Sequence, residues 1–366
     1  MTDTTQFSET RRRQILDEVR TRGSVRVNEL AEQLGVSEPT VRRDINILDH
    51  QGLVTRVHGG AVTRRVSDRA LMGGAAPQQV KQRALGIVTP SMDYYWPTVV
   101  NGVQAAVTAN RGQLILRGSS YSLEDDRAQV MRLLETGRVE GLMVAPMPLT
   151  RASNDMFGWL DTLPLPVVLM ERTVPPEVFA QRLEFVATDQ YYSADLGVRH
   201  FAALGHTKIG LLTNLGTPHH DVAREGWLQS CRSLGLETRG VVCEDAPRFT
   251  TMDRDLLLDG IIERCLRSGT TALIVHADRE AIALLQRVQD LGLSIPGDLA
   301  IIAHDDEIAS LSSPALSAIR PPKRQIGVEA ANLLFRRLAD QSLPLHHVLL
   351  CPELIVRESS GPHKSQ

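Results

Sequence analysis

The sequence of 366 residues contains no run of eighteen or more apolar residues, and no apolar segment stands at its N-terminus. A membrane-spanning helix needs about 20 mostly apolar residues, and a secretory signal needs an apolar core. We therefore expect neither a membrane span nor export. The sequence predicts a cytoplasmic protein without a membrane partner.

Cysteine is also scarce, and the four cysteines show neither CxxC spacing nor a histidine pair at the spacing of zinc ligands: Cys231, Cys243, Cys265 and Cys351. They are expected to be free thiols in a reducing compartment. The adjacent pairs His219-His220 and His346-His347 have poor geometry for a chelate, because sequence neighbours do not share one face. No metal site and no cofactor are predicted.

Three motifs that build phosphate-binding or hydrolytic sites are absent, namely GxGxxG, GxxxxGK[ST] and GxSxG. Dinucleotide, P-loop and serine-hydrolase chemistry therefore lack their sequence signals. The composition is 42% hydrophobic and 23% charged, as in ordinary globular proteins. The length favours more than one domain.

Positive charge is concentrated near the N-terminus. Residues 11–65 contain 11 arginines and 7 acidic residues, a net charge of +4, whereas the rest of the chain carries −7. An excess of four is modest and does not identify a nucleic-acid-binding protein by itself. The local motif has to do so.

The segment 35–61 predicts a helix followed by a small hairpin. Gly35 can end one helix, and Ser37 can begin another near Glu38. Apolar residues at i, i+4 and i+7 of the new helix can pack inward: Val41, Ile45 and Leu48. The polar residues Thr40, Arg42, Arg43 and Asn46 then point elsewhere. Gly52 stops this helix, and the following residues 53–62 form a wing.

The segments VRRD (41–44) and RVHGGA (56–61), with RRRQIL (11–16) and VNELAEQLG (27–35), closely resemble the DeoR-type winged helix-turn-helix. This resemblance covers a domain at 8–65 and implies a bacterial regulator that binds double-stranded DNA. The expected DNA-binding residues are Ser37, Thr40, Arg42, Arg43, Asn46, Arg56, His58 and Gly59. The helix residues would include base contacts, whereas those of the wing would mainly touch phosphate or minor groove.

One position departs from this family. Arg26 precedes the second helix where the family usually has a serine or threonine cap. The change either weakens that helix slightly or adds a phosphate contact.

Residues 66–82 have no sustained period and contain Gly73, Gly74 and Pro77, so we expect a linker. After it, short continuous apolar runs alternate with amphipathic helices. The runs are 85–89, 113–117, 141–145, 166–170, 208–213, 271–275 and 299–303. Strands buried on both faces have this pattern, so the fold class is α/β with parallel sheets and right-handed crossovers.

Segments within 83–361 resemble the sensor domain of the LacI/GalR family: RHFAALGHTKIGLLT (199–213), VAREGW (222–227), 299–334 and CPELIVRESSG (351–361). The resemblance implies a two-lobed, periplasmic-binding-protein-like type I domain. Its first lobe would be about 83–188 and 318–345, and its second lobe about 189–317 and 346–361. Ligands of such domains sit between the lobes, at the carboxyl ends of strands.

The resemblance also implies ligand-binding residues. Arg224 matches an arginine that hydrogen-bonds the ligand, with a salt bridge between the lobes as the alternative. Asp305 matches an acidic contact that can accept two sugar hydroxyls. Further candidates, each with a structural role as the alternative, are Glu171, Asp93, Tyr95, Trp96 and Asp278. Ala277 stands where the family often has an asparagine, which leaves the identity of the ligand open.

The sequence therefore predicts a homodimeric transcriptional regulator, a repressor, that binds an operator with an inverted repeat. A small ligand, a sugar or a sugar derivative, would control this binding. An activator or a sensor of a nucleoside-like ligand is the alternative. A transport binding protein and a sugar-processing enzyme that uses Glu171 with Asp305 are weaker hypotheses, and no catalytic residue is assigned.

Overall fold

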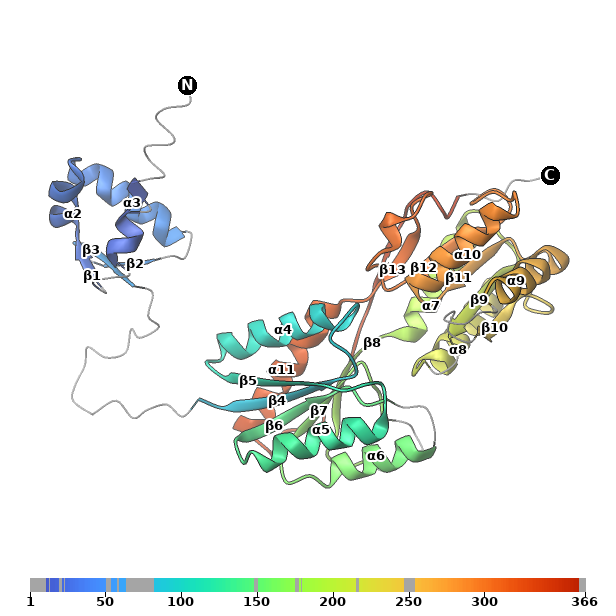
Figure 1. Ribbon diagram of the computed structural model, residues 1–366, viewed down its shortest axis with the longest axis horizontal. Coiled ribbons are helices and arrows are strands. Elements are labelled where there is room, and N and C mark those ends of the chain that lie inside the picture. The colour runs from blue at the N-terminus through green and yellow to red at the C-terminus, as the bar shows by residue number, and fades with distance from the viewer. Residues whose placement is uncertain are drawn as a thin grey trace. The chain divides into compact units, whose positions relative to one another are not determined.

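The computed structural model describes residues 11–12, 14–19, 22, 24–50, 54–57, 59–63, 82–147, 151–174, 178, 180–214, 217–246 and 254–361. The chain divides into two compact units, Met1–Val80 and Lys81–Gln366. Figure 1 shows the elements of both units. None of the described helices combines the length and the apolar character that a bilayer crossing demands.

The first unit is a small helical domain with a three-stranded sheet. Residues 11–12 and 14–19 are helical, and helices α2 (Val27–Leu34) and α3 (Glu38–His50) follow. Strands β1 (Ser24–Arg26), β2 (Val54–Val57) and β3 (Gly60–Thr63) form an antiparallel sheet in the order β1-β3-β2. Gly35 ends α2 in the left-handed conformation, with φ 63°, as predicted.

The predicted apolar stripe of α3 is confirmed. Val41, Ile45 and Leu48 are at most 3% exposed and pack in one core with the first helix and α2. Gly60 lies where β3 crosses close to β1, and a Cβ atom there would lie 2.0 Å from the Val25 carbonyl oxygen. The wing therefore needs glycine at this position.

The second unit consists of two α/β lobes, as predicted. Lobe 1 contains the sheet β14-β8-β7-β6-β4-β5, in which the described pairs are parallel. Its elements are β4 (Ala84–Thr89), α4 (Trp96–Ala109), β5 (Gln113–Gly118), α5 (Leu123–Glu135), β6 (Val139–Val144), α6 (Arg151–Asp161), β7 (Val167–Met170), β8 (Glu184–Thr188), α11 (Lys323–Ala339) and β14 (His347–Leu350). Helices α4 and α11 cover one face of this sheet, and α5 and α6 cover the other (Figure 1).

Lobe 2 contains the sheet β10-β9-β11-β12-β13-β15, which is parallel except for β15. Its elements are α7 (Gln190–Ala203), β9 (Ile209–Asn214), α8 (His220–Ser233), β10 (Cys243–Ala246), α9 (Arg254–Ser268), β11 (Ala272–Val275), α10 (Asp278–Asp290), β12 (Ala300–His304), the 3₁₀ helix η1 (Ala309–Leu311), β13 (Ser317–Arg320) and β15 (Glu353–Ile355). Helices α7 and α8 pack on one face, and α9 and α10 pack on the other. All four cysteines are free thiols.

Two of the predicted borders between the lobes are shifted. The first crossing lies between β8 and α7, near Thr188. The second was predicted near Ser317, but β13 pairs with β12 through Arg320, so the chain crosses after that residue. The third was predicted near His346, but β14 pairs with β8 in lobe 1, so this crossing lies between Leu350 and Glu353. Backbone pairing therefore extends lobe 2 to Arg320 and lobe 1 to Leu350.

Helices α4 and α11 approach closely because each has a glycine at the contact. A Cβ atom on Gly327 would lie 2.0 Å from the carbonyl oxygen of Val99, and one on Gly102 would lie 2.0 Å from that of Arg324. Backbone atoms in two packed helices cannot yield as a flexible side chain does. The helix pair therefore depends on both glycines.

We expect Gly327→Ala to lower the free energy of unfolding by about 1–3 kcal/mol, because the methyl group overpacks the helix crossing. The same change at Gly158 of α6 meets no atom within 4 Å. It should raise stability by about 0.5–1 kcal/mol, because alanine loses less entropy in a helix. All three tryptophans lie in the second unit, so their fluorescence in urea titrations follows this unit. Equal midpoints for the two variants would contradict the close crossing.

Candidate DNA-binding and ligand-binding sites

Helix α3 presents most of the predicted DNA-binding side chains away from its core. Ser37, Arg42 and Arg43 are exposed, and Thr40 and Asn46 are half-buried. The Ser37 and Thr40 hydroxyls lie 2.9 Å apart, and Arg42 pairs with Glu38 at 3.0 Å. Arg43 is exposed and forms no ion pair with another described residue. Its guanidinium is therefore available to a DNA base or phosphate.

Strand β2 of the wing is held against α3 by Arg56. Its guanidinium donates to Asn46 Oδ1 at 2.9 Å, and its backbone N–H donates to Asp49 Oδ1 at 3.2 Å. Gly59 adopts a φ of 85° in the turn between β2 and β3. His58, also predicted to contact DNA, lies outside the described residues. The wing and the helix thus form one polar surface.

Two further arginines of this domain have different surroundings. Arg26 occupies the N-cap position of α2, and its side chain makes no capping hydrogen bond. Arg11 pairs with Asp44 at 2.6 Å, and Asp44 is only 3% exposed. This ion pair ties the first helix to α3. It was not predicted, although Asp44 belongs to the VRRD motif.

A cavity of about 560 Å³ lies between the two lobes of the second unit. Five of the predicted ligand-binding residues line it: Asp93, Tyr95, Trp96, Glu171 and Asp305. Asp93 and Tyr95 stand between β4 and α4, and Trp96 begins α4. Glu171 and Asp305 directly follow β7 and β12. The carboxyl ends of strands from both sheets therefore supply the walls.

Glu171 holds one wall of the cavity together. Its carboxylate accepts hydrogen bonds from the Tyr95 hydroxyl, from the Thr188 backbone N–H at 3.0 Å and from the Thr188 hydroxyl at 2.8 Å. The side chain is buried. These bonds fix the Tyr95 ring, which meets the Trp96 ring edge-on at 5.7 Å. Glu171 thus positions an aromatic platform.

Asp305 lies on the opposite wall, in lobe 2. Its Oδ1 is 3.0 Å from His304 Nδ1. Burial alone would raise the pKa of the Asp305 carboxyl, but the His304 hydrogen bond and the charges of His276 and Lys323 bring this pKa below its usual value. Asp305 is therefore ionised at neutral pH and can accept hydroxyl groups.

Four cavity residues other than glycine occupy the left-handed region of backbone conformation. The φ angles of Tyr94, Tyr121, Glu171 and Asp305 are 56°, 55°, 54° and 102°. Such conformations cost about 1–3 kcal/mol each and gather at functional sites. Their position around one cavity supports a binding role for it.

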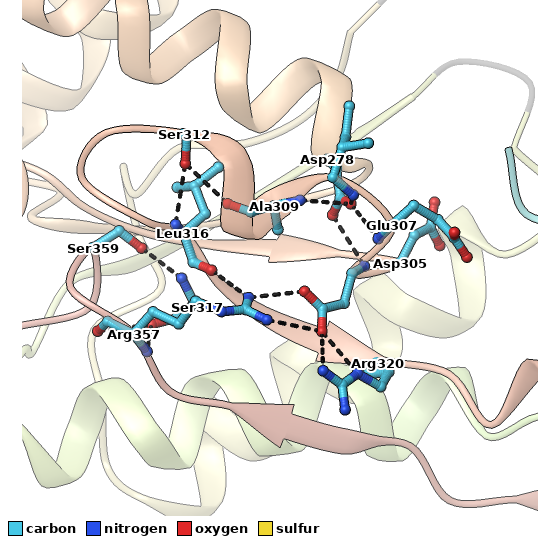
Figure 2. A network of polar contacts seen from close by, with 12 residues as sticks. Asp278, Asp305, Glu307, Ala309, Ser312, Leu316, Ser317, Arg320, Arg357 and Ser359 are labelled. Atoms are coloured by element: carbon cyan, nitrogen blue, oxygen red, sulfur yellow. Dashed lines mark hydrogen bonds and ion pairs between the residues drawn. The ribbon is translucent and has the colours of Figure 1, made fainter. Parts of the chain in front are cut away.

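Asp278, a predicted ligand contact, has a different role. It does not line the cavity and instead accepts hydrogen bonds from four successive backbone N–H groups, those of Asp306 (3.1 Å), Glu307 (2.6 Å), Ile308 (2.9 Å) and Ala309 (3.2 Å). Burial raises the pKa of Asp278 to about 6, so the carboxylate form accepts these bonds at neutral pH. Asp278 anchors the turn that follows Asp305 (Figure 2).

Asp306 secures the same turn from the other side. Its carboxylate receives Arg320 Nε at 2.7 Å and Arg357 Nη1 at 2.8 Å. Arg320 ends β13, and Arg357 belongs to the segment after β15, so Figure 2 shows both arginines converging on one carboxylate. Asp306 is thus a second anchor of the turn.

Arg224, the strongest predicted ligand contact, is not among the cavity-lining residues. Its guanidinium pairs with Asp245 of β10 at 2.5 Å, within lobe 2. Ala223, one position earlier on α8, lines a small adjoining pocket together with His219. Consecutive helical residues point about 100° apart, and in this structure the Arg224 side chain faces Asp245.

The structure adds cavity residues that were not predicted. Three of them carry buried polar atoms without a hydrogen-bond partner among the described residues: Asn214 Oδ1, Arg254 Nε and His304 Nε2. Arg279 also lines the cavity, with its guanidinium 4.9 Å from the Tyr94 ring centroid. Orphaned buried polar atoms are costly unless a ligand or water satisfies them. No sequence motif singled out these residues.

Two family descriptions match the chain. A DeoR-like helix-turn-helix domain matches residues 11–65, and a periplasmic binding protein-like domain matches residues 198–360. The chain therefore carries both types of domain, and the likeness to DeoR concerns the N-terminal one only. The α/β class with parallel sheets and an N-terminal helix-turn-helix is confirmed.

Relatives that span most of the chain are transcriptional repressors. The arabinose metabolism transcriptional repressor of Geobacillus stearothermophilus is 24% identical over 91% of this chain and 90% of its own length. The HTH-type transcriptional repressor PurR of Vibrio cholerae is 27% identical over 91% and 97%.

Solved structures of regulators share the fold. The transcription regulator CcpA of Lactococcus lactis has a TM-score of 0.64 at 20% identity, covering 76% of this chain and 99% of its own. A LacI family transcriptional regulator from Enterococcus faecium with bound ribose has a TM-score of 0.62 at 18% identity, with the same coverage. The likeness in both cases extends across the two-lobed architecture.

We expect Asp278→Asn to destabilise the second unit by about 1–3 kcal/mol. The amide offers one acceptor oxygen, so at least one of the four buried N–H groups would face another N–H donor. Asp290→Asn, at the exposed end of the same helix, is the matched control and should change stability by less than about 0.5 kcal/mol. Urea titrations of tryptophan fluorescence measure both. Equal effects would show that the carboxylate does not anchor the turn.

Proposed function

We propose that this chain is a homodimeric transcriptional repressor that reads its operator with a DeoR-type winged helix. A sugar or sugar derivative in the cavity between the lobes of a LacI/GalR-type sensor would control that reading. The chain is a ligand-controlled transcriptional regulator by its two domains and by its relatives, and it is not an enzyme. A regulator of chromosomal DNA works in the bacterial cytoplasm.

The ligand class is inferred from the combination of polar and aromatic surfaces in the cavity. Lobe 2 offers Asn214 Oδ1, Arg254 Nε and the Asp305 carboxylate, and lobe 1 offers the rings of Tyr95 and Trp96. Sugars have hydroxyl groups that donate and accept hydrogen bonds, and they have an apolar face that stacks on aromatic rings. The arabinose-related relative and the ribose-bound neighbour support this class.

The proposed DNA-binding form is a dimer because one winged helix reads only a few base pairs. A symmetric dimer matches an inverted repeat whose half-sites are separated by about 10–10.5 base pairs or a multiple of this. Ligand that binds one lobe arrangement better than another changes the population of DNA-binding dimers. The sign of the response, repression or activation, is read in a reporter strain with and without ligand.

The enzyme hypothesis rested on Glu171 and Asp305 as an acid–base pair. The Glu171 carboxylate already accepts three hydrogen bonds, and its side chain is buried. A general acid or base must reach the reacting atoms. Glu171 is thus committed to Tyr95 and Thr188, which favours a binding cavity. Mass spectrometry of sugars incubated with pure protein checks whether the cavity binds or converts them. Unchanged sugars support a binding cavity.

The test of the ligand class begins with a thermal-shift screen of mono- and oligosaccharides and nucleosides, because a ligand of the folded state raises its stability. With the hit, we expect Arg254→Ala to lower calorimetric affinity on the order of 10–100-fold, the value of a charge-assisted hydrogen bond. Arg224→Ala should stay within about threefold, since that guanidinium pairs with Asp245. A hit that is only a nucleoside, or the reverse ranking of the two variants, contradicts the proposal.

The DNA-reading surface has its own test. We expect Arg43→Ala to weaken operator binding by about 1–3 kcal/mol, because a guanidinium that reads a guanine forms two hydrogen bonds. Arg267→Ala, which removes an equally exposed arginine of lobe 2, should leave operator affinity unchanged. Gel-shift titrations on genomic fragments selected by the wild-type protein measure both. Unchanged binding by Arg43→Ala would remove this residue from the interface.

A further inference from the structure

Two histidines and an aspartate meet at the ends of neighbouring strands of lobe 2. Strands β11 and β12 are parallel and adjacent, with Val275 opposite Ala303. His276 directly follows β11, His304 is the last residue of β12, and Asp305 comes next. All three line the cavity. Parallel pairing therefore brings together residues that are 28 positions apart in sequence.

Their donor atoms are close enough to share one ion. One ring nitrogen of each histidine and one carboxylate oxygen of Asp305 lie within 4.8 Å of one another. Ligand atoms around a tetrahedral zinc ion are separated by about 3.3 Å, given bonds of about 2.0–2.1 Å. His304 Nδ1 and Asp305 Oδ1 are already 3.0 Å apart. This contact is a hydrogen bond, so the shared proton leaves when an ion binds between the two atoms.

A second observation points to a ligand at the same place. His304 is 5% exposed, and its Nε2 has no hydrogen-bond partner among the described residues. Because His304 Nδ1 is directed at Asp305, Nε2 points away from that carboxylate, and a hydrogen-bonding group of a ligand that reaches Nε2 recovers the cost of this buried atom. The His304 ring borders the cavity, so that group can enter from the ligand side.

We propose that His276, His304 and Asp305 bind a divalent transition metal ion, with Zn²⁺ as the representative, at the lobe 2 wall of the cavity. Two imidazoles and one carboxylate suit Zn²⁺, Ni²⁺ or Fe²⁺ better than Mg²⁺ or Ca²⁺, which take mainly oxygen ligands. Three protein ligands leave at least one coordination position open to the cavity.

The charges nearby are compatible with a bound cation. Asp305 supplies one negative charge. The Lys323 ammonium donates to the Asp305 carbonyl oxygen and also pairs with Glu307 at 2.6 Å, which offsets its positive charge. Glu280, which lines the same cavity, adds a carboxylate to the wall. The surroundings of the ion would therefore include negative as well as positive side chains.

A metal ion at this site would also narrow the chemical class of the effector. This part of the inference rests on the proposed function. Asp305 is the residue assigned to sugar hydroxyls, so the ion and the ligand meet at the same carboxylate. Oxygen atoms on adjacent carbons, as in a vicinal diol or a hydroxy acid, can occupy an open coordination position. The sensor would then respond to metal and ligand together.

The ion site is tested without sugar or DNA. Untagged full-length protein is stripped with a chelator, dialysed, and titrated with Zn²⁺ in a calorimeter and with Co²⁺ in a spectrophotometer. We expect one ion per chain and a visible Co²⁺ absorption band. His276→Ala and His304→Ala should each weaken binding by about 100-fold or more, beyond the roughly 10–100-fold cost of losing an outer-shell partner. His347→Ala, an exposed histidine of lobe 1, should bind as the wild type does.

His304→Gln and circular dichroism of every variant separate a lost ligand from a lost fold. A folded His304→Gln protein without the ion supports the site. Absence of one-to-one binding, or equal affinity in wild type and both cluster variants, overturns it. Ligand affinity that is the same with chelator and with Zn²⁺ overturns the joint response. Because ion binding is measured alone, failure to find a sugar ligand would leave this result intact and would count against the proposed function only.

Discussion

The sensor depends on a buried carboxylate that organises a turn. Asp278 begins α10 and accepts four consecutive N–H groups of the segment after β12. That segment begins with Asp305, whose φ of 102° needs support from its surroundings. Asp306 then ties the turn to β13 and to the C-terminal segment through two arginines. The position of the Asp305 carboxylate, which lines the cavity, is thus determined by groups that do not line it.

Residue patterns predicted the centre of each sheet better than its edges. Strands such as β4 and β12 are buried at every position, so their continuous apolar runs are visible in the sequence. Strands β8, β10, β13, β14 and β15 were missed. Three of these, β10, β14 and β15, stand at sheet edges, and only Ala246 among the residues of these three is fully buried. Because edge strands are held by backbone hydrogen bonds, composition alone does not reveal them.

The residues of the candidate site were also predicted only in part. Glu171 and Asp305 were predicted from the resemblance to the LacI/GalR family, and in the structure both directly follow buried strands and line the cavity. Arg224 was assigned to the ligand by a motif match, which does not fix the direction of a side chain, and in the structure its guanidinium pairs with Asp245. Asn214 and Arg254 come from separate elements, and only the tertiary structure shows that they share a cavity. Unsatisfied polar atoms are a property of packing and have no signature in sequence.

The two walls of the cavity differ in what they offer a ligand, and this difference gives control. Lobe 1 supplies the aromatic rings of Tyr95 and Trp96, whereas lobe 2 supplies the unsatisfied atoms of Asn214 and Arg254. A ligand that stacks on one wall and hydrogen-bonds the other gains its full binding energy only when both walls reach it. Its affinity therefore depends on the arrangement of the lobes. A ligand can shift a conformational equilibrium only by its differential affinity for the two states. A cavity whose two walls come from different lobes supplies that differential affinity. A cavity built from a single lobe would lack it.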